Sequence, residues 1–119
     1  MPYRPNATMR KAAREALEHR KTLPPSQRFG TPVGLARARD IANNVQLSLE
    51  TILRMRSFLA RHKKNWDLYK DKPKKEWGAG AWSYYLWGGP SAVAWVEDKV
   101  KRYERAGELP SQRKTRRRG

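Results

Sequence analysis

Apolar residues recur at intervals of three and four positions between residues 37 and 62, which places them on one face of an α-helix. Asn43 and Asn44 interrupt this pattern, and asparagine tolerates the left-handed backbone conformation that a sharp turn needs. Ser48 follows as a good N-cap, and Leu47 and Ile52 flank it with the spacing of a hydrophobic staple. The stretch therefore predicts two helices joined by a tight turn. Their apolar face consists of Ile41, Ala42, Val45, Leu47, Ile52, Met55 and Leu59.

The same periodicity predicts further helices on both sides of this pair. Residues 8–21 carry a stripe of small apolar side chains, so this helix is expected to pack closely on a neighbour. Residues 81–87, AWSYYLW, predict one or two helical turns, and residues 91–106 predict the last long helix. The intervening residues 88–90, Gly-Gly-Pro, break the helical pattern and are expected to form a turn.

Local signals set the boundaries of the central pair. Thr31 and Pro32 suit the N-cap and the first residue of a helix, so the two helices are expected over residues 32–43 and 49–62. Residues 62–80 are polar and rich in lysine, and they are predicted to be irregular. No segment alternates in the way a half-buried strand does. The predicted fold class is all-α, a small bundle of four to five helices around a central helix-turn-helix-like hairpin.

The chain is short enough for one domain with two extensions. Residues 1–7 contain two prolines and are predicted to be an extended N-terminal arm. Residues 8–107 are predicted to be the helical domain. Residues 108–119 end in RKTRRRG and are predicted to be a disordered basic tail.

Charge is the strongest overall property of the sequence. Lysine and arginine number 27, against 11 aspartate and glutamate residues, which gives a formal net charge of +16. Such a chain attracts polyanions, so nucleic acid is the expected partner, ahead of an anionic membrane, an acidic protein or charge kept for solubility. No apolar run is long enough to span a membrane, and no signal peptide is expected. The absence of cysteine excludes disulfides and thiol chemistry.

The central pair can be interpreted in two ways. It matches a helix-turn-helix DNA-binding unit at its apolar positions, although Gln46 stands where that motif often has glycine. In that register Leu49 and Leu53 would face the major groove, where hydrogen-bonding side chains read the bases. The two leucines fit better against another element of the protein. We therefore favour a helical hairpin within a core and keep the sequence-reading unit as the alternative.

Phosphate contacts are expected from basic residues around the hairpin, in the lysine-rich stretch and in the tail. The candidates are Arg37, Arg54, Arg56, Arg61, Lys63, Lys64, Lys74, Lys75, Arg113, Lys114, Arg116, Arg117 and Arg118. Trp66 and Trp77 lie among the lysines, and either they form a lid over the core or they stack on bases or anchor a partner. Trp82, Trp87 and Trp95 have apolar or small neighbours and are predicted to be core residues.

Residues suited to catalysis or metal binding are few. The two histidines, His19 and His62, lie in different predicted helices, and no metal-ligand spacing or paired carboxylates stand out. A carboxylate site assembled from Asp40, Glu50 and Asp67 is the alternative. We expect no enzymatic activity, no cofactor and no metal site.

The strings GLARARDIANNVQLSLETILRMRSFLARH and LWGGPSAVAW resemble a small uncharacterised domain found in proteins of tailed bacteriophages. The resemblance covers roughly residues 10–96 and implies a phage origin, with no catalytic residues to carry over. Pro90 stands where many members of that family have an acidic residue. The residues that carry the pattern are Gly34, Arg37, Arg39, Leu47, Ser48, Phe58, Arg61, His62, Trp87, Gly88, Gly89 and Trp95.

Together, charge and resemblance predict a non-catalytic phage-type protein that binds nucleic acid, DNA rather than RNA, mainly through its phosphates. One alternative is a virion structural protein, such as a capsid, connector or internal component, that contacts packaged DNA or an acidic shell protein. A second is an inhibitor or adaptor of a host protein. The expected location is the host cytoplasm during infection, or the virion.

Overall fold

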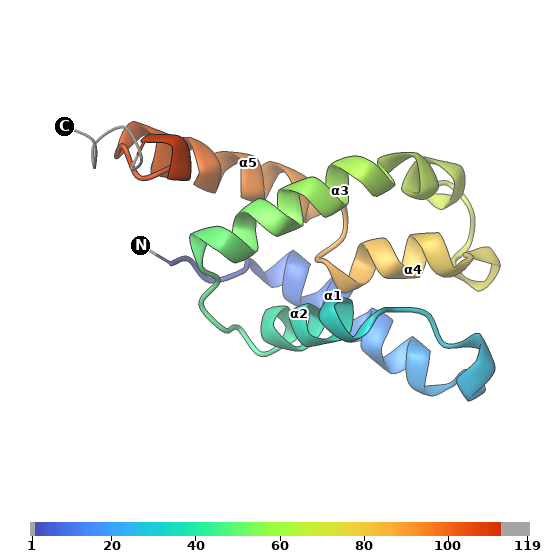
Figure 1. Ribbon diagram of the computed structural model, residues 1–119. Coiled ribbons are helices and arrows are strands. Elements are labelled where there is room, and N and C mark those ends of the chain that lie inside the picture. Colours follow the sequence, from blue (N-terminus) through green and yellow to red (C-terminus); the bar gives the residue numbers. More distant parts are fainter. Residues whose placement is uncertain (1, 113–119) are drawn as a thin grey trace.

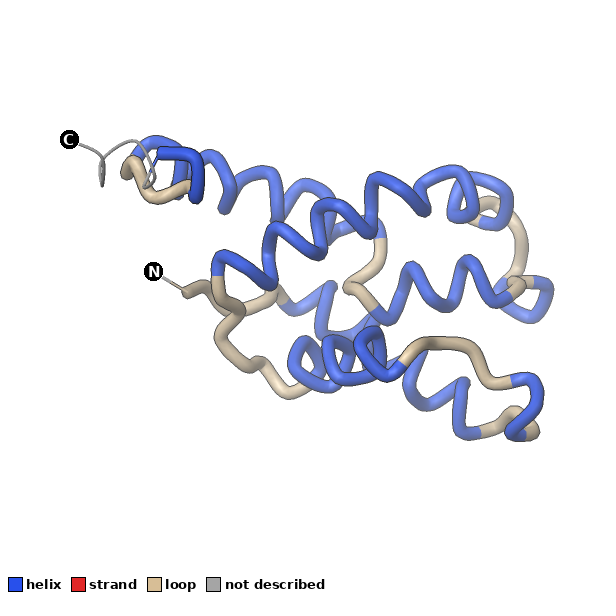
Figure 2. The backbone as a smooth tube through the Cα atoms, viewed as in Figure 1, coloured by secondary structure: helices blue, strands red, loops and turns tan. Residues whose placement is uncertain are grey.

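The computed structural model describes residues 2–112, and over this range it is built of α-helices with two short 3₁₀ turns (Figure 1). The predicted all-α fold class is therefore confirmed. Within the described residues no β-strand forms (Figure 2), and Tyr3 and Leu47 make one isolated antiparallel bridge. The α-helices are α1 (Ala7–Lys21), α2 (Pro32–Ala42), α3 (Leu49–Tyr69), α4 (Ala79–Leu86) and α5 (Pro90–Arg105), and the 3₁₀ turns are η1 (Pro25–Gln27) and η2 (Lys74–Glu76).

Side-chain caps fix where the first three helices begin. The side chain of Asn6 accepts a hydrogen bond from the backbone N–H of Met9 at the start of α1, 2.8 Å away. Thr31 does the same for Gly34 at the start of α2, and Ser48 for Thr51 at the start of α3. Each bond satisfies an N–H that has no partner inside the helix. The N-caps predicted at Thr31 and Ser48 are confirmed.

The short helix α4 lies at the centre of the bundle. It packs against α1, α2 and α3, while α1 pairs with α2 and α3 pairs with α5. Figure 1 shows the α3–α5 pair on one side of α4 and the α1–α2 pair on the other. Ala81, Trp82, Tyr84 and Leu86 of α4 are buried, which accounts for the apolar character of this helix.

The core joins side chains from all five helices. Small side chains on α1, at Ala12, Ala13 and Ala16, are buried and allow close approach of its neighbours, as expected. Trp82, Trp87 and Trp95 are buried, which confirms their prediction as core residues. The other large side chains of the core include Met9, Ile41, Leu47, Ile52, Met55, Leu59 and Val96.

The helices α2 and α3 do not close on each other as the predicted hairpin requires. Residues 43 and 44 form a turn, in which Asn44 has the expected left-handed backbone with φ 59°. Residues 45–48 then form an extended connection to α3. Ile41 and Ile52 are both fully buried in the common core. However, α2 packs mainly against α1, whereas α3 packs against α4 and α5. The two helices therefore diverge, and Val45 between them is 42% exposed instead of buried.

The helix α3 is longer than predicted. It continues to Tyr69, so residues 63–69 are helical and their assignment to an irregular stretch was wrong. Glycine and proline are absent from residue 49 to residue 72, so nothing stops the helix there. Lys63 also pairs with Asp67 one turn further on, at 2.8 Å. A dense run of charge had looked like a loop although its charges fall at helical spacings.

Both ends of the described chain are held in place. In the N-terminal arm, Tyr3 exchanges two backbone hydrogen bonds with Leu47, of 3.2 and 2.7 Å, and its ring meets Tyr103 edge-on. At the other end, the first residues of the predicted tail fold back on α5. Leu109 packs against the core, and the Gln112 side chain donates to the carbonyl of Glu104. The predicted tail beyond this point, residues 113–119, lies outside the described residues.

Candidate functional site

Three arginines from the N-terminal arm and α1 converge on the C-terminal end of α2. Arg4 donates from Nη1 to the carbonyl of Asn44 at 2.8 Å. Arg10 donates to the carbonyl of Pro5 and to the side-chain oxygen of Asn44, at 3.0 and 3.4 Å, and Arg14 reaches the carbonyl of Ala42 at 3.5 Å. The end of a helix carries partial negative charge, so cations are stabilised there. We call Arg4, Arg10 and Arg14 the arginine cluster.

The positive charge of the arginine cluster is not neutralised by carboxylates. The oxygen atoms that its guanidinium groups contact belong to backbone carbonyls and an amide, and none of the three arginines forms an ion pair with another described residue. Glu15, which follows Arg14 in sequence, is paired with Lys74, and Asp40 of α2 is paired with Arg37. Guanidinium groups have five N–H donors each, so donors remain for a bound anion.

The arginine cluster was missed from sequence because its members lie 28 to 40 residues from the loop that they contact. The sequence nevertheless carried a partial signal. Arg10 and Arg14 are one helical turn apart and lie off the apolar stripe of their helix, which puts them side by side on its exposed surface. Only the packing of α1 against α2 shows that Arg4 joins them.

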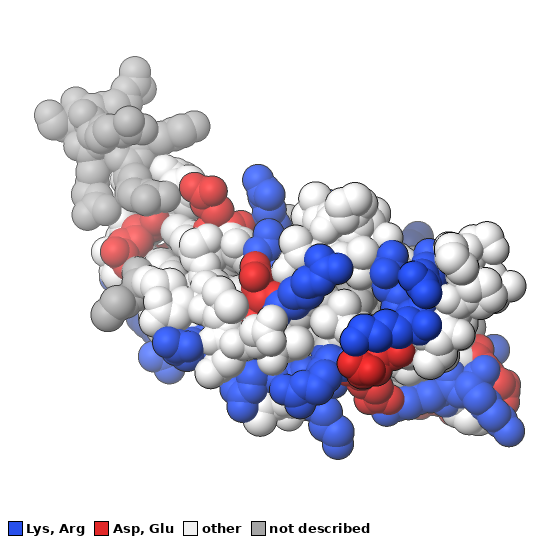
Figure 3. Space-filling view, turned by 90° about the horizontal axis from the view of Figure 1, so that it is seen from below, with Lys and Arg blue, Asp and Glu red and all other residues white. Residues whose placement is uncertain are grey.

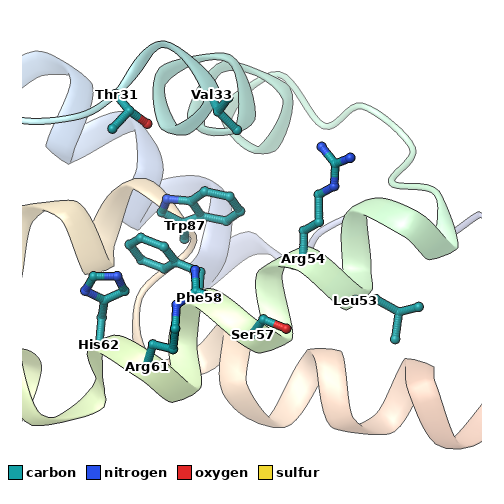
Figure 4. A pocket seen from close by; sticks show the side chains of 9 residues that line it. All are labelled: Thr31, Val33, Leu53, Arg54, Ser57, Phe58, Arg61, His62 and Trp87. Carbon is teal, nitrogen blue, oxygen red and sulfur yellow. The ribbon is translucent and has the colours of Figure 1, made fainter.

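A groove opens where α2 and α3 diverge. It lies between the start of α2 and the middle of α3 and has a volume of about 620 Å³ (Figure 4). We call it the α2–α3 groove. Its lining residues are Thr31, Val33, Leu53, Arg54, Ser57, Phe58, Arg61, His62 and Trp87.

Aromatic rings form the floor of the groove. Phe58 lies between Trp87 and His62, with ring-centroid distances of 4.5 and 4.1 Å and interplanar angles of 14° and 27°. Trp87 caps the C-terminal end of α4 and lies between α2 and α3 in Figure 4. Gly34 makes room for its indole, because a Cβ atom at that position would lie 3.3 Å from Nε1 of Trp87. The floor thus fixes the spacing of three helices.

The wall of the groove formed by α3 is polar and basic. Arg54, Ser57 and Arg61 lie on one side of this helix, and Figure 4 shows Arg54 extending toward α2. Neither Arg54 nor Arg61 has an ion-pair or hydrogen-bond partner among the described residues. Val33 of α2 lies at the opposite rim and is 52% exposed. The groove therefore combines an apolar floor with two uncompensated cations.

Several of the predicted phosphate ligands are instead paired within the protein. Their pairs are Arg37–Asp40 at 3.0 Å, Arg56–Glu97 at 2.7 Å, Lys63–Asp67 at 2.8 Å and Lys74–Glu15 at 2.7 Å. The hydrogen bond with Asp67 raises the pKa of Lys63, and the same bond lowers the pKa of Asp67. The pairs of Arg56, Lys63 and Lys74 lie at the surface, where ion pairs are weak and can exchange partners, so they do not exclude phosphate contact. The Arg37 side chain is only 16% exposed and is less accessible to a phosphate.

The remaining residues predicted to bind phosphate either have no ion-pair partner or lie outside the described residues. Arg54, Arg61, Lys64 and Lys75 are exposed and have no ion-pair partner among residues 2–112. The tail residues Arg113, Lys114, Arg116, Arg117 and Arg118 lie outside the described residues. Figure 3 shows lysine and arginine side chains in several separate groups on one face of the molecule, with acidic groups between them. Lysine and arginine side chains therefore do not form a single continuous patch on that face.

Trp66 and Trp77 belong to an aromatic cluster at the junction of α3, η2 and α4. Trp66 stacks on Tyr84, with ring centroids 5.4 Å apart and planes 6° from parallel, and it meets Trp77 edge-on. Trp77 also contacts Trp82 and Tyr85, and its Nε1 donates to the carbonyl of Lys72 at 2.9 Å. Both rings are partly buried against the core, as expected for a lid. A base-stacking role for them stays a prediction.

The described residues contain no group of three histidine or acidic side chains placed to hold a metal ion. No helix among them is long and apolar enough to cross a membrane. Asp40 and Asp67 are engaged with Arg37 and Lys63, respectively. Comparisons with protein-family models, with curated proteins and with solved structures found no match to this chain.

Proposed function

We propose that this is a non-catalytic, phage-type protein that binds nucleic acid, DNA in preference to RNA, mainly through phosphate contacts. The observation that carries the proposal is the arginine cluster, where three guanidinium groups gather without a carboxylate to neutralise them. The net charge of +16 supports the same conclusion for the molecule as a whole. A phosphate group can accept two parallel hydrogen bonds from one guanidinium group. The bonds to backbone carbonyls use only some of the guanidinium N–H donors, so others remain for a phosphate.

Binding of this kind gains free energy from the release of counterions. Each phosphate that a cation neutralises frees condensed ions from the nucleic acid, so affinity falls as salt rises. Leu49 and Leu53, which would face the major groove if the central pair read bases, are both packed against the core. We therefore expect little preference among sequences.

The test is fluorescence anisotropy of a labelled random-sequence duplex at several salt concentrations. The variant Arg10→Gln/Arg14→Gln removes two charges from the arginine cluster and should weaken binding about tenfold, with a salt slope smaller by about two units. The matched control Lys101→Gln/Arg105→Gln removes two exposed charges from α5 that do not belong to the cluster. Equal losses in both variants would mean that net charge alone matters, and no binding by the unaltered chain at low salt would overturn the proposal.

A protein partner is the second candidate function, and the α2–α3 groove favours it. Its apolar floor is a feature that binding to phosphates does not require. A virion structural protein or an adaptor of a host protein would both need such a surface. In the first case the basic surface would meet packaged DNA or an acidic shell protein.

A further inference from the structure

We infer that the α2–α3 groove binds an acidic, amphipathic segment of a partner protein. This surface is separate from the arginine cluster, which lies at the opposite end of α2. The inference therefore goes beyond nucleic-acid binding and does not depend on it. It rests on three observations. The wall of the groove is basic, its rim is apolar and exposed, and the faces of the aromatic rings in its floor are already covered by other side chains.

The positive charge of the groove wall favours a partner that carries carboxylates. Arg54 and Arg61 are the charged residues that line the groove, and no acidic side chain lines it with them. They lie two turns apart on α3, about 10 Å along the helix axis. Carboxylates two turns apart on a helix that lies along α3 would match this spacing. Arginine binds a carboxylate through two parallel hydrogen bonds, which adds orientation as well as affinity.

The apolar surface calls for large hydrophobic side chains beside those carboxylates. Val33 is 52% exposed at one rim, while Leu53 and Phe58 are partly buried along α3 and Trp87 forms the floor. The volume of about 620 Å³ falls within the range of roughly 300–1,000 Å³ that is typical of binding pockets. An amphipathic helix that lays its apolar side into a groove uses this combination of an apolar floor and a charged rim.

Nucleic acid fits the groove less well than an acidic segment does. A base would need an open aromatic face, but Phe58 has a ring on each side and Trp87 is only 7% exposed. The apolar floor also offers no groups that pair with base edges. We therefore assign the groove to a protein partner, with a single-stranded nucleic acid as the competing occupant in the test.

The experiment selects binders to the full chain from a random library of displayed peptides. We expect enriched peptides that combine acidic residues with a large apolar residue. A labelled synthetic copy of one such peptide is then measured by fluorescence anisotropy. Arg54→Gln/Arg61→Gln should weaken its binding at least about tenfold. Val33→Asp, which puts negative charge at the exposed rim, should also weaken it without a change in helix content measured by circular dichroism.

A control variant and a competitor complete the design. Lys75→Gln/Lys101→Gln removes the same charge from exposed positions outside the groove and should leave peptide binding within about twofold of the unaltered chain. Enriched peptides that lack acidic residues, or binding that the groove variants do not change, would overturn the inference. Displacement of the peptide by an oligo-thymidine strand that fails to bind Arg54→Gln/Arg61→Gln would assign the groove to nucleic acid instead.

The experiments can contradict nucleic-acid binding by the arginine cluster and peptide binding by the groove independently of each other. The arginine-cluster variant Arg10→Gln/Arg14→Gln should keep peptide binding while it loses duplex binding. The groove variant Arg54→Gln/Arg61→Gln should lose peptide binding and lower duplex affinity no more than a control that removes the same charge. Loss of both activities in both variants would show one shared surface and would overturn the separation on which the inference rests.

Discussion

The ring of Phe58 stacks on that of Trp87, with centroids 4.5 Å apart and planes 14° from parallel. A side chain from the middle of α3 is thereby joined to the residue that ends α4. Trp87 lies in turn against Gly34 of α2. One aromatic contact therefore holds together the three helices that surround the α2–α3 groove, so the floor of the groove is part of the fold.

This contact should be visible in the stability of the protein. We expect Phe58→Ala to lower the free energy of unfolding by about 3 kcal/mol, because it removes the stack and leaves a cavity over Trp87. Phe58→Leu keeps most of the apolar volume and should cost about 1 kcal/mol. Urea denaturation measures both values. Equal losses for the two variants would mean that the ring, and not the filled volume, is what matters at this position.

The start of α3 offers a second test, of the core itself. Ile52 is fully buried, and Ile52→Ala should lower the free energy of unfolding by about 2–5 kcal/mol. Val45 in the preceding loop is 42% exposed, so Val45→Ala should change it by less than about 0.5 kcal/mol. Both are read from chemical denaturation under the same conditions. A loss below 1 kcal/mol for Ile52→Ala would contradict the burial of this side chain.

Salt dependence tests the share of the tail in nucleic-acid binding. We expect a slope of about −5 to −7 when the logarithm of the duplex binding constant is plotted against the logarithm of salt concentration. Removal of residues 113–119, which hold five lysine and arginine residues, should flatten this slope by about three to four units. The truncation spares Gln112 and its bond to Glu104, so helix content should not change.

An unchanged slope after this truncation would remove the tail from the binding surface. A selected duplex that binds about a thousandfold more tightly than random DNA would contradict phosphate-dominated binding and favour a sequence-reading regulator.

Burial of Tyr84 predicts sensitivity to alkali. Burial raises the pKa of this phenol above its ordinary value, because the charged form is poorly solvated. The unfolded chain therefore loses this proton at lower pH than the folded protein does. Above about pH 10 the unfolded state binds fewer protons, so stability falls as pH rises. Tyr84→Phe should reduce that fall, as measured by urea denaturation at a series of alkaline pH values. The same slope in both proteins would contradict the assignment.

Local signals predicted the starts of α2 and α3 and the turn between them well. The caps at Thr31 and Ser48 and the left-handed turn at Asn44 depend on residues within a few positions of one another, so the sequence alone reveals them. The predicted α3 is too short, because a dense run of lysines is typical of a loop as well as of an exposed helix. The pair of Lys63 and Asp67 shows that such charges can support a helix.

The arrangement of the helices could not be predicted in the same way. The apolar faces of α2 and α3 are compatible with a mutual pairing or with separate partners, and nothing in their periodicity distinguishes the two. The central position of α4 decides the outcome, since α4 packs against both α2 and α3, and Trp87 at its C-terminal end lies between them (Figure 4). The α2–α3 groove and the arginine cluster both follow from that packing.

The bridge between Tyr3 and Leu47, together with the contact of Tyr3 with Tyr103, has a consequence for how the protein is made. On the ribosome, residue 3 is synthesised well before residue 47 and long before residue 103. The contact of Tyr3 with Tyr103 therefore cannot form until α5 has been synthesised. Because Arg4 lies in the same arm, the arginine cluster is fully anchored only when α5 is in place. A nascent chain stalled before α5 should hence bind nucleic acid more weakly than the released protein.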